Sequence, residues 1–433
     1  MTRRAVLVVC DSLRADMVDA ATSPTLARFR DEAAHFTAFR GVFPSTTRTS
    51  AASIATGCLP AGHGLLGNTM VLDDGEGLTC FSAGKPDFLD RLRRATGRAL
   101  GRPTLHERVR GLGEAVAMSN VSPGAAYVHD PEGAGYVYHR SGSFGPGRQR
   151  LDDGLAIEVG AAGDDVMTAR FCDEVLARRR PPYAVLWLSE PDHTGHHAPL
   201  GSPGHRAAIA SADRNVARVL EAIERLDASG DEILVGICSD HGMQTIRRLI
   251  DVDARLVEAG FKESATSGDV VLAPQGTSVI LHFAEEARAR IDAVAEWLAA
   301  QDFAGQVIRG EALAALGLPL GGTLAIAVSL AGDDEPNAFG IRGRSDVAES
   351  AFGGEYLPGH GQHGGLAAYE QSPFLALRGP GIERGARSAP ASLIDIAPTI
   401  LRHLGLSDDG VQGSALQVRA VRLESANPWR EKR

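Results

Sequence analysis

The sequence predicts an α/β fold in which a doubly wound, mostly parallel β-sheet carries helices on both faces. Short, continuous apolar runs recur along the chain, and helical stretches separate them. Such runs are typical of parallel strands that are covered on both faces, whereas half-exposed strands alternate apolar and polar residues. The chain has 433 residues, which is longer than one hydrophobic core usually supports. We therefore expect one large core domain and a smaller insertion.

The strands and helices of the predicted core alternate along the chain, which favours the doubly wound arrangement. The apolar runs predicted as buried strands are Ala5–Cys10, Ala115–Met118, Ala184–Leu188 and Ile233–Cys238. The stretches predicted as helices are Ser23–Ala34, Ser50–Thr56, Asp164–Arg178 and Ser202–Leu226. Such sheets bind ligands beyond the carboxyl ends of their strands, so polar residues that directly follow a strand are the first candidates for a site.

Two segments depart from this pattern. Residues 123–154 are rich in glycine and aromatic residues and are predicted as a loop excursion. Residues 251–357 hold their own strand–helix–strand set (TSVILHF, IDAVAEWLAAQ, TLAIAVSL), which predicts an inserted α+β cap subdomain. The core is then residues 1–250 and 358–420, returning at SPFLALRGPG and closing with the helix SLIDIAPTILRHLGL. The polar tail 421–433 is expected to be loose.

Composition limits the classes of partner and compartment. The net charge of −10 disfavours a nucleic-acid polymer or an anionic membrane surface. The first apolar run meets Asp11 after six residues, and no run approaches the roughly 20 apolar residues of a membrane span, so we expect neither a secretory signal nor a membrane helix. The five cysteines form no CxxC pair, which suits reduced thiols in a cytoplasmic protein. The oligomeric state is not indicated.

Acidic residues and histidines follow three of the predicted strands. Asp11 directly follows the first strand, Asp240 and His241 follow the fourth, and Asp192 and His196 follow the third. Carboxylate and imidazole ligands without cysteine suit Zn²⁺ or Mn²⁺. The alternative is that the aspartates cap helices and the histidines are unrelated to them. One such aspartate means little, but three strand ends with the same chemistry favour a metal centre.

A hydroxyl-rich turn precedes one of the predicted helices, in the segment GVFPSTTRTSAASIATG. A hydroxyl at a helix N-terminus faces free backbone N–H groups and a positive dipole, which suits a nucleophile that attacks phosphate. By chemistry alone the candidates are Thr46, Thr47, Thr49 and Ser50, and each of them is equally suited to simple helix capping.

The sequence resembles the alkaline phosphatase superfamily and, within it, the type I phosphodiesterase/nucleotide pyrophosphatase group. The matching features are Asp11, FPSTTR followed by TGCLPAGHGLLGN, EPDHTGH, SDHGM and the late GQHGG. They span residues 11 to 365, and the cap is much less alike. The resemblance implies an alkaline phosphatase-like core with two divalent metal ions, zinc first and manganese or iron as alternatives.

Carried onto this sequence, the resemblance implies two metal sites and a nucleophile. One ion would be held by Asp11, Asp240 and His241. The other would be held by Asp192, His196 and a late histidine, for which His363 is preferred over His360. Thr47 takes the nucleophile position, where its oxygen would bridge or face both ions and so also counts as a metal ligand. Asn68 takes the position of an amide donor to a phosphoryl oxygen.

The implied activity is that of a phosphodiesterase or nucleotide pyrophosphatase that acts on a small phosphorylated substrate through a covalent phospho-threonine. The alternatives are a phosphonate-cleaving hydrolase of the phosphonoacetate hydrolase type, a phosphomonoesterase and, from another class, a phosphomutase. The absence of cysteine at position 47 disfavours a sulfatase.

Basic residues near the predicted site are few. None of the three lysines (Lys85, Lys262 and Lys432) lies at a place that matches the lysines of phosphonoacetate hydrolases. Arg48 is expected to pack outward, because the next residue of a helix points about 100° away from its neighbour. Arg48, Arg140 and Arg148 are nevertheless candidates to bind an anionic substrate. The alternative for Arg140 and Arg148 is that they are solvated loop charges.

Overall fold

A ten-stranded sheet forms the centre of the computed structural model, which describes residues 2–73, 75, 77–227, 230–353 and 356–417. Its strands, in spatial order, are β21 (Gly385–Arg387), β2 (Ala34–Phe36), β20 (Leu375–Arg378), β11 (Glu232–Cys238), β1 (Arg3–Cys10), β10 (Tyr183–Leu188), β6 (Val116–Ser119), β7 (Tyr136–Tyr138), β8 (Phe144–Gly145) and β9 (Gln149–Arg150). The four predicted strands are the parallel neighbours β11, β1, β10 and β6. The predicted α/β fold with a large, mostly parallel sheet is confirmed.

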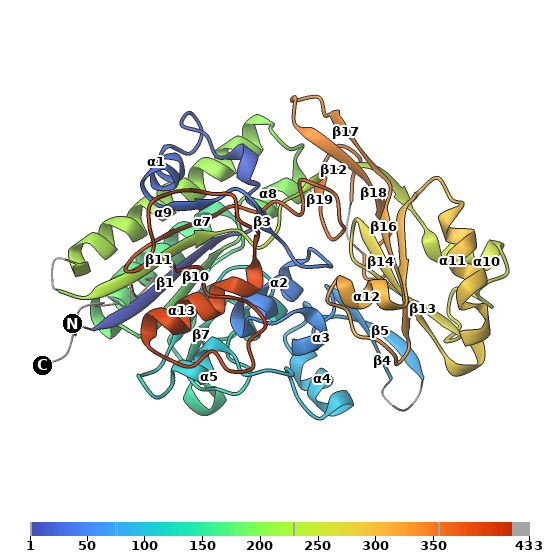
Figure 1. Cartoon of the computed structure of the whole chain (residues 1–433), viewed down its shortest axis with the longest axis horizontal. Coiled ribbons are helices and arrows are strands. Elements are labelled where there is room, and N and C mark those ends of the chain that lie inside the picture. Colours follow the sequence, from blue (N-terminus) through green and yellow to red (C-terminus); the bar gives the residue numbers. More distant parts are fainter. Residues whose placement is uncertain (1, 74, 76, 228–229, 354–355, 418–433) are drawn as a thin grey trace, which may run out of the picture.

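Helices cover both faces of the sheet (Figure 1). Alternate residues of β1 point to opposite sides, so Leu7 and Val9 belong to one hydrophobic core and Val6 and Val8 to the other. The first core includes α2 (Thr47–Thr56), α4 (Phe88–Thr96), α5 (Leu105–Val109), α6 (Pro123–Tyr127) and α13 (Ile396–Leu404). The second includes α1 (Pro24–Glu32), α7 (Ala161–Arg170), the π-helix η3 (Phe171–Arg179) and α9 (Pro203–Asp227).

Strand β20, in the returning segment SPFLALRGPG, runs antiparallel to β11. The chain leaves the sheet at the carboxyl end of β11 and comes back to the same edge after the long segment 239–374, so the next strand has to run in the opposite direction. The segment 123–154, predicted as a loop excursion, contains α6 and the short strands β7, β8 and β9, which extend the sheet at one edge.

A second region beside the sheet is built from antiparallel strands and two helices (Figure 1, yellow to orange). Its sheet has the order β13 (Val270–Pro274), β14 (Ser278–Phe283), β16 (Leu324–Leu330), β15 (Ala304–Arg309). Helices α10 (Val252–Glu258) and α11 (Ile291–Ala299) share one core with this sheet. The hairpin β4 (Thr69–Asp73) and β5 (Leu78–Ser82) and helix α12 (Glu311–Ala315) share another.

A smaller sheet joins the two regions. It has the order β17 (Gly332–Pro336), β18 (Arg342–Ala348), β12 (Gln244–Ile250), β19 (Gly361–Gln362). Strands from both sides of the predicted cap boundary at residues 250 and 251 meet in it, and that boundary stays a prediction. The other short elements are η1 (Ala15–Met17), β3 (Phe39–Arg40), α3 (Pro60–His63), η2 (Pro146–Arg148), α8 (Asp192–His197), η4 (Glu285–Arg290), β22 (Ala391–Ser392) and η5 (Leu393–Asp395). The predicted tail 421–433 lies outside the described residues.

Candidate active site

Three neighbouring strands deliver acidic side chains to one edge of the main sheet. Strands β11, β1 and β10 are parallel neighbours and end at Cys238, Cys10 and Leu188. Their carboxyl ends therefore lie side by side, and the aspartates that follow them are brought together. The structure places the six aspartates and histidines predicted as metal ligands in two clusters at this edge, in each of which the candidate ligand atoms lie within 4.8 Å of one another.

The first cluster is Asp11, Asp240 and His241, all fully buried. His241 Nε2 lies 3.0 Å from Asp240 Oδ2 and 3.6 Å from Asp11 Oδ1. Burial, together with the carboxylates of Asp240 and Asp192, raises the pKa of Asp11 well above its ordinary value. Two buried carboxylates this close to each other call for a positive counter-charge.

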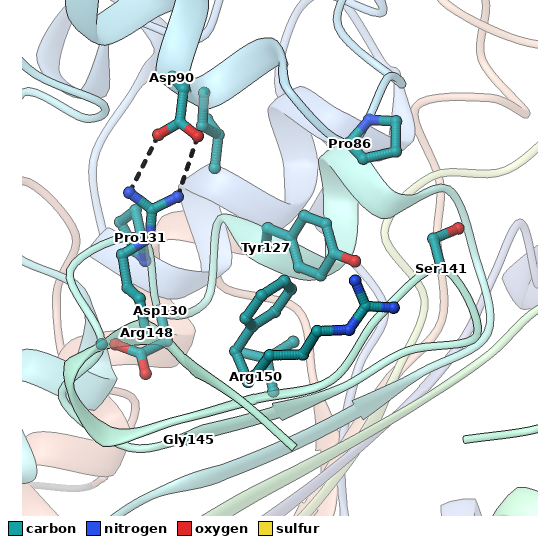
Figure 2. Close-up of a pocket in the computed structure, with 13 residues that line it drawn as sticks. Pro86, Asp90, Tyr127, Asp130, Pro131, Ser141, Gly145, Arg148 and Arg150 are labelled. Carbon is teal, nitrogen blue, oxygen red and sulfur yellow. Dashed lines mark hydrogen bonds and ion pairs between the residues drawn. The ribbon is translucent and has the colours of Figure 1, made fainter. Parts of the chain in front are cut away.

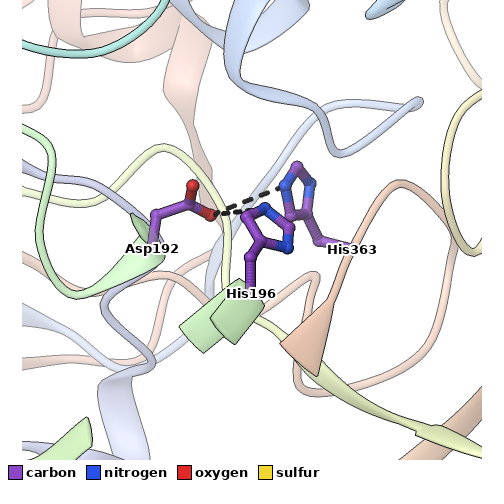
Figure 3. Close-up of side chains that lie close together, drawn as sticks. All are labelled: Asp192, His196 and His363. Carbon is purple, nitrogen blue, oxygen red and sulfur yellow. Dashed lines mark ion pairs between the residues drawn. The ribbon is translucent and has the colours of Figure 1, made fainter. Parts of the chain in front are cut away.

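The second cluster is Asp192, His196 and His363 (Figure 3). Asp192 and His196 are four residues apart on α8 and so share one face of that helix. Asp192 Oδ1 lies 3.3 Å from His196 Nε2 and 3.6 Å from His363 Nε2. The rings of His363 and His241 stack with their centroids 3.7 Å apart, so the two clusters are adjacent.

The donor atoms of both clusters fit divalent metal ions. One oxygen each of Asp11, Asp192 and Asp240 is buried without a hydrogen-bond partner. The Nδ1 atoms of His196, His241 and His363 face the backbone carbonyls of Gly361, Gly242 and Ser45 at 3.1, 2.9 and 2.8 Å. This contact fixes the tautomer that leaves Nε2 free as a ligand, an arrangement typical of metal-binding histidines.

His360, the alternative late histidine, is not part of either cluster. Its Nδ1 instead lies 3.1 Å from the carbonyl oxygen of His196. Of the other histidines near the motifs, His193 and His197 line the rim of the site, while His63 is buried and contacts Ser53 Oγ through Nε2.

Thr47 is the first residue of α2 and is buried beside the first cluster. Its Oγ1 lies 3.2 Å from His241 Nε2. The hydroxyl of Thr46 turns away and donates to Thr49 Oγ1 at 3.0 Å. Of the four hydroxyls that chemistry alone left open, the helix N-terminus therefore presents that of Thr47 to the cluster.

Asn68 lies opposite Thr47 at the start of the β4–β5 hairpin. Its side-chain oxygen accepts from the backbone N–H of Arg48 at 3.3 Å, which leaves the amide nitrogen to donate into the pocket. Its own backbone N–H donates to Gln275 Oε1 at 2.6 Å. The second region thus helps to position Asn68, a contribution that local sequence does not reveal.

Supporting residues around the clusters have no motif that identifies them. Ser12 takes a left-handed conformation (φ 62°), from which its backbone N–H donates to Asp240 Oδ1 at 3.1 Å. Trp187 Nε1 donates to Asp11 Oδ2 at 2.9 Å. The buried carboxylate of Asp164 accepts from the backbone N–H groups of Ser189 and Glu190 and so fixes the turn that leads to Asp192. Strain of the Ser12 kind is a known feature of functional sites.

The clusters open into a pocket of ≈ 360 Å³, here called the strand-end pocket. It is lined by Asp11, Thr47, Arg48, Asn68, Val121, Ser122, Arg140, Val159, Ser189, Asp192, His193, His196, His197, Tyr356, Gln362 and His363. The outward orientation predicted for Arg48 is wrong. The Cα–Cβ bonds of a helix tilt towards its N-terminus, so side chains of the first turn reach past the helix end into the pocket.

Arg140 and Arg148 differ in their surroundings. Arg140 is not a solvated loop charge, because its Nη1 donates to the carbonyl oxygens of Asn120 and Val121 at 2.5 and 2.8 Å, and it lines the strand-end pocket. Arg148 lies in a separate pocket of ≈ 350 Å³ formed by the 123–154 segment and α4, here called the excursion pocket (Figure 2). There it pairs with Asp90 through two contacts of 3.0 and 3.1 Å.

Comparison with known proteins agrees with this geometry. The family model described as "Type I phosphodiesterase / nucleotide pyrophosphatase" matches residues 5–314. The chain belongs to this family. Family membership makes it a metal-dependent hydrolase of phosphoester bonds, and the two clusters are the candidate sites for divalent ions. No curated protein sequence matches it.

Solved structures of other proteins share the fold at low identity. Murine ectonucleotide pyrophosphatase / phosphodiesterase 5 has a TM-score of 0.66 and 18% identity, with 95% of this chain and 98% of that chain covered. An inactive threonine-to-alanine variant of the murine protein in complex with AMP has a TM-score of 0.66 and 17% identity, with 95% of this chain and 97% of that chain covered. Phosphonoacetate hydrolase from Sinorhizobium meliloti, in complex with phosphonoformate, has a TM-score of 0.64 and 17% identity, with 93% of this chain and 95% of that chain covered.

The described residues contain no helix that is long and apolar enough to cross a membrane. All five cysteines are free.

Proposed function

We propose that the protein hydrolyses a small phosphodiester or a phosphoanhydride-linked nucleotide through a covalent phospho-threonine at Thr47. The observation that carries the proposal is the position of Thr47 Oγ1, 3.2 Å from His241 Nε2, at a helix N-terminus where the two clusters meet. A helix N-terminus stabilises the negative charge of a phosphoryl group. The murine relative loses activity when a threonine is replaced by alanine, which supports a threonine-dependent reaction.

Two divalent ions are proposed at the clusters, one held by Asp11, Asp240 and His241 and the other by Asp192, His196 and His363. The mixture of carboxylate and imidazole favours zinc, with manganese or iron as alternatives. When bound, such ions neutralise the charge of the phosphoryl group and acidify a nearby hydroxyl.

The residues of the chain then carry out the transfer in two steps. Thr47 Oγ1 forms a bond to phosphorus, the bond from phosphorus to the leaving oxygen breaks, and the proton of the threonine hydroxyl passes to that oxygen. Water then attacks the phospho-threonine, releases the phosphorylated product and restores the hydroxyl. Asn68 holds a phosphoryl oxygen through its free amide nitrogen.

A diester substrate is favoured over a monoester by the charge around the phosphoryl group. Asn68 meets that group with a neutral amide, whereas the guanidinium of Arg48 is held to one side by Ser122 Oγ at 3.0 Å. A singly charged diester requires less positive charge than a doubly charged monoester. We also propose a cytoplasmic location, which the free cysteines support.

The test compares an aryl nucleotide diester with the matching aryl monoester after metal removal and reconstitution. Chelation is expected to abolish hydrolysis, re-addition of zinc to restore it, and kcat/KM to be higher for the diester. Full activity of metal-free protein would exclude the two-metal reaction. Preference for the monoester would indicate a phosphomonoesterase, and phosphate that is moved rather than released would indicate a phosphomutase.

A further inference from the structure

A second pocket adjoins the strand-end pocket and shares part of its wall. It has a volume of ≈ 270 Å³, and the residues common to both pockets are Arg48, Asn68, Tyr356 and Gln362. The rest of its lining comes from the β4–β5 hairpin and the turn after it, and from the second region, including Lys85, Gln275 and Phe352. We call it the neighbouring pocket. A substrate whose phosphoryl group lies between Thr47 and Asn68 has room there for a substituent.

The neighbouring pocket is positively charged. Arg48 and Lys85 both line it, and none of the described residues in its lining is an aspartate or glutamate. Neither the Arg48 guanidinium nor the Lys85 ammonium forms an ion pair in the described part of the chain. Two unpaired cations facing one small pocket attract an anion.

Arg48 is held in place for this role. Its Nε donates to Ser122 Oγ at 3.0 Å, and its backbone N–H donates to Asn68 Oδ1. Its guanidinium lies against Gly84, where an added Cβ would come within 2.6 Å of Nη2. Glycine at position 84 therefore makes space for the guanidinium. The two terminal nitrogens are left without a hydrogen bond among the described residues, so they are available to a ligand.

We propose that the substrate carries a second anionic group, remote from the bond that is cleaved, and that Arg48 and Lys85 bind this group in the neighbouring pocket. This inference rests on the proposed function, because the pocket is defined relative to Thr47 and Asn68. Guanidinium binds carboxylate and phosphate alike through paired hydrogen bonds, and lysine adds a point charge. The recognised group is therefore a carboxylate or a phosphate.

Two matched pairs of chromogenic esters separate these sources. The first pair is the mono-para-nitrophenyl esters of carboxyethylphosphonate and propylphosphonate. The second is para-nitrophenyl thymidylate with and without a phosphate on the free sugar hydroxyl. In one pair, the member with the extra anion is expected to have a kcat/KM roughly 10- to 100-fold higher than its partner, mainly through KM, as for hydrogen bonds to charged groups. The pair that shows the preference identifies carboxylate or phosphate.

Variants assign the preference to the two cations. Lys85→Met and Arg48→Met are each expected to reduce the ratio of kcat/KM within that pair by roughly 10-fold, and Lys85→Arg to retain most of it. Arg150→Met removes a comparable exposed arginine from the excursion pocket and is expected to leave the ratio unchanged. Metal content and melting temperature confirm that each variant is folded. Lys85 is exposed, so the Lys85 variants are expected to fold and suffice for the test if Arg48→Met does not fold.

The failures of the two proposals differ. If the reconstituted protein hydrolyses the esters with equal kcat/KM within both pairs, or if the preference survives in both methionine variants, the anion pocket is refuted and the proposed function stands. If none of these esters nor any nucleotide diester is hydrolysed, the proposed function fails and the anion pocket falls with it.

Discussion

The strand-end pocket and the excursion pocket have nearly the same volume, ≈ 360 and ≈ 350 Å³. They differ in whether the carboxylates beside them have hydrogen-bond partners within the chain. In the excursion pocket the acidic groups are satisfied within the chain. Asp90 pairs with Arg148 (Figure 2). The two oxygens of Asp130 accept from the backbone N–H groups of Ala134 and Gly135. In the strand-end region, Asp11, Asp192 and Asp240 each keep a buried oxygen without a hydrogen-bond partner among the described residues, and the near neighbours of these oxygens include the Nε2 atoms of the cluster histidines.

This difference indicates that buried polar atoms without a hydrogen-bond partner, rather than pocket volume, distinguish the reactive site. Leaving a buried polar group unsatisfied costs about 1–3 kcal/mol, and more when the group is charged. A fold that gathers three such oxygens at one sheet edge is unstable there unless a ligand compensates. The satisfied acidic groups of the excursion pocket need no such ligand.

The largest expected effect comes from the nucleophile in the strand-end pocket. Thr47→Ala is expected to lower kcat by about three to six orders of magnitude while metal content and folding stay near those of the unmodified protein, because the hydroxyl acts mainly in the transition state. Steady-state kinetics with an aryl diester and metal analysis measure this.

Thr46→Ala is the matched control, since the Thr46 hydroxyl contacts Thr49 rather than the cluster. It is expected to retain most of the activity. An inactive Thr46→Ala together with an active Thr47→Ala would move the nucleophile by one residue.

A smaller but still large effect is expected at the second cluster. His363→Ala removes a ring nitrogen beside Asp192 Oδ1 and should reduce the bound metal from two ions to one. The accompanying loss of kcat/KM should exceed the roughly 10- to 100-fold that removal of an outer-shell partner costs.

His360→Ala provides the comparison, because His360 contacts the backbone carbonyl of His196 and contributes no ligand atom to the cluster. It should keep both ions. Metal stoichiometry of the two variants decides between them, and the reverse pattern would place the ligand at His360.

The smallest effect is expected in the excursion pocket. Asp90→Asn removes the ion pairs of Asp90 with Arg148 and Arg93. The side chains of Asp90, Arg148 and Arg93 are 41%, 48% and 28% exposed. An exposed ion pair contributes about 0–1 kcal/mol, so the free energy of unfolding should fall by no more than about 2 kcal/mol and kcat/KM should stay within about two-fold. Chemical denaturation and diester kinetics measure both quantities. A large loss of activity would contradict the contrast between the two pockets.

The sequence alone predicted the sheet and the edge where acidic residues gather. Each apolar strand ends at a polar residue that is visible in the sequence, and the carboxyl ends of parallel neighbours meet at one edge, so Asp11, Asp192 and Asp240 could be expected to converge. These are local features combined with one rule of topology. The order of the family motifs added the candidate roles of Thr47 and Asn68.

Only the tertiary structure decided which of several equivalent side chains faces the site. Thr46 and Thr47 have the same chemistry, and the orientation of the first turn of α2 separates them. The same turn directs Arg48 into the pocket, contrary to the angular argument from helix periodicity. Lys85 and Tyr356 are 271 residues apart in the chain and line one pocket only because the second region packs beside the main sheet. Local patterns fix where a strand ends, but the direction of a side chain depends on contacts between segments that are distant in sequence.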